Sequence, residues 1–184
     1  MKENGVANPG ALGLGGFALT TFLLSLVNAR IIAPESIGVV LPMAFLYGGL
    51  AQILAGMWEF KSGNIFGATA FTSYGAFWMG LALMITLEAT GTIAAVPPAG
   101  LAAFLGAWGG FTIYAAIAAA KVSKSLLTLL ITLTITFFLL AAGEFYPSLQ
   151  LAGGYLGIVV AAIAWYISAG ILINDVFKRR VLPL

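Results

Sequence analysis

Residues 8–17 read NPGALGLGGF and mark the point where a polar amino terminus becomes the first long apolar run of the chain. Asn8 suits a helix N-cap, because its side-chain oxygen can accept a hydrogen bond from an unpaired backbone N–H, and Pro9 suits the first helical position. The next two turns carry almost no side chains, because they contain Gly10, Gly13, Gly15 and Gly16. Phe17 is then the first bulky group on a face that also carries Thr20.

Two interpretations of this helix start remain open. Small residues in membrane helices let neighbouring helices approach closely, which favours a packing groove. The positive end of the helix dipole at Asn8 equally suits an anion that enters a narrow path.

The composition indicates an integral membrane protein. Of 184 residues, 61% are apolar and 8% charged, with a mean hydropathy of +1.07, which leaves too little polar surface for a water-soluble domain. The chain contains neither cysteine nor histidine, so thiol and histidine catalysis and the metal sites built on those residues are excluded, and we expect no cofactor. A net charge of +2, with basic residues at span ends, gives no indication of a nucleic-acid partner.

Six apolar runs are each long enough to cross a hydrocarbon core of about 30 Å as a helix. We therefore predict an all-α protein in which residues 1–184 form one transmembrane domain, with the second span regular because Pro42 lies early enough to be tolerated. The predicted spans are residues 12–28, 37–57, 67–87, 99–120, 126–142 and 152–173.

The basic residues predict the orientation. Arg30 is alone on one side of the membrane, with Glu35, Glu88 and Glu144. These carboxylates are interpreted as solvated loop charges, with the alternative that they shape an outer mouth. The other side has seven basic residues, which places both termini in the cytoplasm of a cell membrane. These seven are Lys2, Lys61, Lys121, Lys124, Lys178, Arg179 and Arg180. The first run has no basic region directly before it, so a cleavable signal is not expected.

No charged side chain lies near the centre of any span, so a proton relay within the protein is not expected. Hydroxyls, amides and aromatic rings remain to line a path for a small solute. In the third span Tyr74 points away from a face of small residues that suits helix packing, namely Thr69, Thr72, Ser73, Ala76 and Gly80. In the second span Gln52 is an amide well inside the hydrocarbon region, and Glu59 follows on the same face.

A hydroxyl stripe bordered by Leu133 runs along the fifth span. Its members fall within about 60° of one another on a helical wheel, and they are Ser125, Thr128, Thr132 and Thr136. The stripe could line a path. Such hydroxyls also commonly bond to the backbone carbonyl one turn back, and the two interpretations stay open.

Several separated motifs resemble the acetate uptake transporter family, which includes succinate-acetate permeases and fungal acetate and ammonia-export proteins. Residues 8–14, NPGALGL, are similar to the family's NPAPLGL signature, with Gly10 and Ala11 replacing Ala and Pro. The other matching stretches are YGGLAQILAGMWEF at 47–60, GNIFGATAFTSYGAFW at 63–78, LTITFFLLAAG at 133–143 and VLP at 181–183. The fourth span carries the weakest match.

The resemblance implies a six-helix protomer similar to urea channels, assembled as a homo-hexamer in the lipid bilayer with one path per protomer. It also implies transport of acetate and small monocarboxylates, with succinate as a further candidate, and a constriction formed by Phe17, Tyr74 and Leu133. The alternatives are a channel for urea or ammonia and, more remotely, a scaffold; no enzyme activity is expected.

An apolar constriction would be a barrier where a carboxylate loses water, rather than its binding site. We expect the Tyr74 hydroxyl, the flanking Thr20 and Thr132, and the helix dipole near Asn8 to offset part of that cost. The substrate-binding candidates are accordingly Asn8, Thr20, Gln52, Thr132 and Thr136. Because the neutral acid is scarce at pH 7, uptake should rise with acidity through the substrate itself, and single Glu-to-Gln changes at Glu59, Glu88 and Glu144 should leave this dependence in place.

Overall fold

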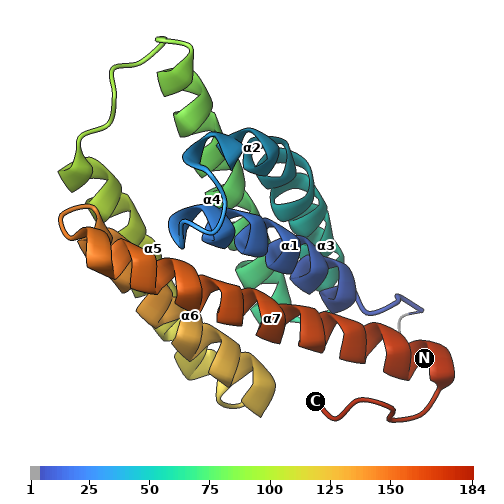
Figure 1. The fold of residues 1–184 in the computed structure, drawn as a ribbon. Coiled ribbons are helices and arrows are strands. Elements are labelled where there is room, and N and C mark those ends of the chain that lie inside the picture. The colour runs from blue at the N-terminus through green and yellow to red at the C-terminus, as the bar shows by residue number, and fades with distance from the viewer. Residues whose placement is uncertain (1–4) are drawn as a thin grey trace.

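The computed structural model describes residues 5–184, and in this part of the chain six helical segments are long and apolar enough to cross a membrane. The predicted all-α membrane fold is therefore confirmed (Figure 1). The helices are α1 (Gly10–Asn28), α4 (Ile65–Ala89), α5 (Pro98–Ala119), α6 (Lys124–Gly143) and α7 (Pro147–Phe177), with one composite span after α1. That span begins with the short 3-10 turn η1 (Pro34–Ser36) and contains α2 (Ile37–Phe45), η2 (Leu46–Ala51) and α3 (Gln52–Lys61).

The helix bounds differ most from the prediction in the last span. Helix α7 begins at Pro147, five residues before the predicted start, and continues to Phe177. Proline is well suited to the first turn of a helix, because its missing N–H has no intrahelical partner there. The segment 147–151 was predicted as a connection, and it instead forms the first turn of α7.

Helix α1 lies inside the bundle, where it packs along α7 on one side and against α2, α3 and α4 on the other (Figure 1). Its glycines make this possible. A Cβ atom on Gly13 would lie 2.7 Å from the ring of Phe71, and one on Gly16 would collide with the carbonyl oxygen of Tyr47. The packing interpretation of the NPGALGLGGF stretch thus holds for both of these glycines.

The second span is not a regular helix, contrary to the prediction. Residues Leu46–Ala51 form a π-helical stretch after Pro42. Ala44 and Gln52 would lie about 80° apart on an uninterrupted α-helix, and one extra residue in the π turn reduces this to about 20°. Both side chains are in fact buried, at 2% and 1% exposed. The π turn therefore keeps Gln52 on the interior face.

The two ends of the described chain lie at the same end of the bundle. Residues 5–8 border a surface hollow together with Ile171, Asp175 and Leu184. The final residues fold back on α7, because the Asn174 amide pairs with the backbone of Val181 and Leu182, and Leu184 packs on Gly170. This arrangement agrees with an even number of spans and accounts for the VLP motif.

Candidate functional site

Two cavities of similar size lie end to end inside the bundle. The terminal-end cavity, about 190 Å³, lies near the chain termini, and the far-end cavity, about 200 Å³, lies toward the opposite end. Phe17 and Leu133 border both cavities. The terminal-end cavity has the polar lining residues Asn8, Gln52, Glu59 and Asn64. The far-end cavity has Thr21, Ser25, Asn28, Thr136, Glu144 and Gln150.

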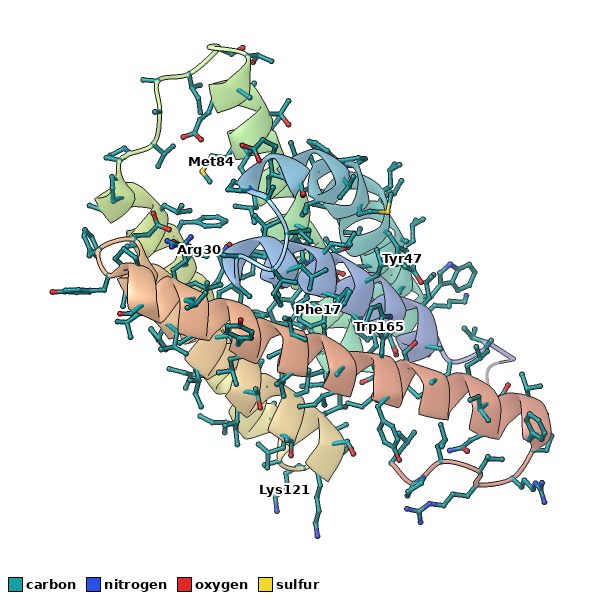
Figure 2. All side chains as sticks on the ribbon, in the orientation of Figure 1. Phe17, Arg30, Tyr47, Met84, Lys121 and Trp165 are labelled. Carbon is teal, nitrogen blue, oxygen red and sulfur yellow. The ribbon has the colours of Figure 1, made fainter. Side chains whose placement is uncertain are left out.

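The two cavities meet at side chains that they share. Across the described helices, no Cα atom of α6 lies within 8 Å of one in α1 or α4. The space is filled by Phe17 from α1, Tyr74 from α4 and Leu133 from α6, each 4% exposed or less. The rings of Phe17 and Tyr74 are 5.7 Å apart, and Figure 2 shows Phe17 midway along the bundle. Phe17 and Leu133 thus lie between the two cavities, and Tyr74, which borders the terminal-end cavity, packs against Phe17.

The Tyr74 hydroxyl is not available to a passing carboxylate. It donates to Thr112 Oγ1 on α5 at 3.0 Å, and the Thr112 hydroxyl in turn donates to the carbonyl oxygen of Trp108 at 2.7 Å. Thr112 is fully buried. The expectation that this hydroxyl offsets the dehydration of an anion is therefore not supported by the geometry.

Sequence reasoning missed Thr112. It lies in the fourth span, where the resemblance is weakest, and its partner is 38 residues away. The signal in the sequence is the one Ser or Thr of the fourth span, one turn after Trp108, and such a hydroxyl commonly bonds to the backbone carbonyl of its own helix. Rings from α5 also surround the α4 aromatics, since Phe111 lies 5.2 Å from Tyr74 and Trp108 lies 5.3 Å from Phe77.

The terminal-end cavity contains a buried carboxylate. Glu59 is 2% exposed, and its Oε2 accepts hydrogen bonds from Asn64 Nδ2 at 2.8 Å and from Ser62 Oγ at 3.2 Å. The carboxylate also lies beside Gly67 in the first turn of α4 and near Gly10 at the start of α1. The positive ends of two helices therefore already face an anion, which belongs to the protein itself.

Asn8 and Gln52 line the same cavity in different ways. The Asn8 side chain accepts a hydrogen bond from Gly10 N at 2.9 Å, but the N-cap of α1 is Pro9, so the predicted N-cap position of Asn8 is wrong by one residue. Gln52 is 1% exposed, and its Oε1 has no hydrogen-bond partner within residues 5–184. A buried amide without a partner is costly, so this side chain is suited to a polar molecule in the cavity.

The threonine candidates are divided between the cavity wall and the packed regions. Thr20 is buried against Gly48 and donates to the carbonyl of Gly16, so it borders neither cavity, and Thr132 does not border them either. Thr136 lines the far-end cavity. In the hydroxyl stripe, Thr128, Thr132 and Thr136 each donate to the carbonyl four residues earlier. These three residues therefore support the interpretation that the hydroxyls of the stripe bond to the backbone of their own helix.

The small-residue face of α4 is only partly packed. Thr72 contacts the position of Gly56, as the packing interpretation predicts. Thr69, Ala76 and Gly80 are exposed, and a Cβ atom on Gly80 would meet no other atom within 4 Å. This part of the face points away from the rest of the protomer.

Glu144 lies at the mouth of the far-end cavity, directly after the end of α6. Partial burial raises the pKa of its carboxyl group above the ordinary value. Desolvation is the cause, because burial penalises the charged form. Of the three loop carboxylates on this side, Glu144 is the one that lines a cavity.

Comparisons with known proteins agree with the six-helix fold. Residues 1–184 match the profile of the GPR1/FUN34/yaaH family. The solved structure of the bacterial acetate channel SatP superposes with a TM-score of 0.94 at 40% identity, covering 97% of this chain and 99% of that one. The succinate-acetate/proton symporter SatP of Escherichia coli (strain K12) is 39% identical over 100% of this chain and 98% of its own. The ammonia transport outward protein 2 of Saccharomyces cerevisiae is 39% identical over 87% of this chain and 59% of its own.

Proposed function

Because the chain belongs to the GPR1/FUN34/yaaH family, we propose that it transports acetate and related small monocarboxylates across a membrane, with succinate as a further candidate substrate. The path runs from one cavity to the other through the constriction of Phe17, Tyr74 and Leu133. The observation that carries this proposal is that Phe17 and Leu133 border both cavities.

The constriction selects by size and by ease of dehydration. An apolar ring gives a carboxylate no compensating charge, so the anion loses water there at a cost of several kcal/mol. Each extra methylene gains only about 0.8 kcal/mol from apolar contact. Discrimination against longer acids must therefore come from steric clash in the ring. The neutral acid avoids most of the dehydration cost, which favours uptake at acidic pH.

Binding takes place in the cavities on either side of this barrier. In the terminal-end cavity Gln52 is the best-placed polar side chain, because its unpartnered Oε1 can accept a hydrogen bond from the O–H of the neutral acid, and Asn8 lies at the entrance. In the far-end cavity Thr136 is the candidate, although its hydroxyl proton is directed to Thr132 O. Thr20 and Thr132 take no part in the proposed path, because neither borders a cavity.

A second candidate function is transport of ammonia or another small neutral solute, because one relative is named for ammonia transport. The unpartnered Gln52 Oε1 can accept from a neutral acid or from ammonia alike, so the preference for the acid rests on the relatives named for acetate. Uptake of labelled acetate into liposomes distinguishes the two. We expect propionate to compete and urea and ammonium to leave uptake unchanged, whereas competition only by the latter would support the alternative.

We also infer a homo-hexamer. Gly106 and Gly110 on α5 and Gly80 on α4 have no neighbour within 4 Å of a Cβ position, so these small residues are available for contact with another protomer. In contrast, Gly153 and Gly157 pack on Leu140 and Ser25 within the protomer. The number six comes from the resemblance alone. Native mass spectrometry in lipid should give a hexamer, and a monomer there would contradict this assignment.

The proposed location is the cell membrane, with both termini in the cytoplasm. The basic side chains support it, because Arg30 lies toward the opposite end of the bundle from Lys121 (Figure 2). Lys2, one of the seven, lies outside the described residues. A cysteine introduced at Leu184 should react with an impermeant reagent only after the cells are opened.

A further inference from the structure

We infer that Thr112 on α5 is a positioning residue for the constriction: by accepting the Tyr74 hydrogen bond it fixes the ring and keeps the phenolic proton out of the path. The inference rests on the proposed function. It concerns a residue outside both cavity walls, on a helix that contributes none of the three constriction side chains.

The hydrogen bonds of Thr112 determine the direction of the Tyr74 proton. Thr112 has a single hydroxyl proton, and that proton is committed to the carbonyl oxygen of Trp108 at 2.7 Å. Thr112 can therefore only accept from Tyr74, and Tyr74 must donate. The phenolic proton points toward α5 as a result, and the aromatic ring is what Tyr74 presents to the terminal-end cavity.

The side chains of Tyr74 and Thr112 are both buried. Tyr74 is 3% exposed and Thr112 is fully buried, so neither hydroxyl can exchange its partner for bulk water. Without the acceptor on Thr112, the phenol would be a buried donor with no partner. The nearest remedy is a rotation of the ring toward the terminal-end cavity, where a carboxylate or a water molecule could accept its hydrogen bond.

Aromatic side chains of α5 pack against the Tyr74 ring. Phe111 meets the Tyr74 ring edge-on at 5.2 Å, and Trp108 lies 6.3 Å from it, so α5 supplies a fixed aromatic wall behind the ring. Helix α5 otherwise packs mainly on α6, while Ile117 on its outer face is 70% exposed. The Tyr74–Thr112 bond thus couples the constriction to a peripheral helix.

The test compares lactate and acetate uptake by purified protein in liposomes. Thr112→Val removes the acceptor at constant volume, and it should raise the lactate-to-acetate ratio about fivefold, the change that one hydrogen bond of ordinary strength makes. Thr112→Ser keeps the acceptor and should retain the wild-type ratio. Thr134→Val is the matched control, because the Thr134 hydroxyl likewise donates to the carbonyl four residues earlier, that of Leu130, and lies outside both cavities.

A double-mutant cycle separates positioning from simple packing. In a Tyr74→Phe background, where no phenolic proton exists, Thr112→Val should change the ratio no further. A ratio unchanged by Thr112→Val in the wild-type background, or an equal change in both backgrounds, would overturn the inference. If Thr112→Val alters only the melting temperature, the bond is structural and the inference also fails. Absence of acetate uptake by the wild-type protein would instead contradict the proposed function.

Discussion

The two cavities differ in how their polar side chains are held. At the terminal end, Glu59 is fixed by Asn64 and Ser62 beside two helix starts, and Asn8 bonds to the first residue of one of those helices, Gly10. At the far end, Glu144 and Gln150 have no side-chain hydrogen bond within residues 5–184, and Glu144 is partly exposed. The terminal-end cavity is therefore a preorganised charged site, whereas the far-end cavity is an adaptable mouth. Substitutions of charge should consequently have larger effects at the terminal end.

Joining the two cavities should produce the largest change. Phe17→Ala removes a ring that borders both, so acetate flux should rise about tenfold or more, because a barrier lower by about 1.4 kcal/mol accelerates passage tenfold. The variant should also lose about 3 to 5 kcal/mol of stability. Uptake is measured per folded protein in liposomes.

Phe22→Ala is the control, since Phe22 packs on Trp165 and borders neither cavity. Equal acetate flux in the two variants would show that the Phe17 ring does not separate the two cavities in the wild-type protein. The cavities would then form one continuous space.

Removing the fixed charge at the terminal end should produce the next largest effect. Glu59→Gln keeps an oxygen that can accept from Asn64, but it takes the negative charge out of a cavity that an anion must enter. The half-saturation concentration for acetate should fall severalfold, because like charges in a site of low dielectric repel strongly. Glu59→Ala should in addition lower stability by about 1 to 3 kcal/mol, since buried donors lose their acceptor.

Concentration dependence of uptake and thermal unfolding report these two effects separately. Asp175→Asn serves as the control, because Asp175 is exposed and pairs with Lys178 at the same end of the bundle. A half-saturation concentration that Glu59→Gln leaves unchanged would mean that the carboxylate is purely structural.

The smallest effect is expected at the far-end mouth. Ionised Glu144 repels an approaching anion, so Glu144→Gln should raise acetate uptake up to about twofold near neutral pH at low salt. Partial burial raises the pKa of Glu144, so the wild-type carboxylate becomes neutral as the pH falls through that raised value. The difference between variant and wild type should then disappear. A difference that grows on acidification would have the wrong sign for this account.

The sequence was sufficient for the features that depend on local pattern. The lengths of the apolar runs predicted the six spans, and the bare face of the first helix was enough to single out Phe17. The sequence pattern also located the stripe of hydroxyls on α6. It did not distinguish hydroxyls that line a path from hydroxyls that bond to the preceding turn, as they do in the structure.

Features that depend on contacts between helices could not be predicted. The π turn is accommodated by tertiary contacts, since Gly48 packs on Thr20 and Gly49 on Met79. Glu59 lies at the end of a span, where a carboxylate is normally solvated, and it is buried only because Gly67 leaves room beside it. The role of Thr112 likewise depends on a partner in another helix.

The central claim is that Leu133, with Phe17 and Tyr74, selects substrates by steric clash at the boundary between the cavities. Uptake of lactate and acetate by the wild type and Leu133→Ala, normalised to folded protein in liposomes, tests it most directly, with Leu127→Ala as a control outside both cavities. The account predicts a higher lactate-to-acetate ratio for Leu133→Ala, with acetate flux equal or higher. An unchanged ratio, together with a stability loss of about 2 to 5 kcal/mol, would make Leu133 an ordinary packing residue and contradict the claim.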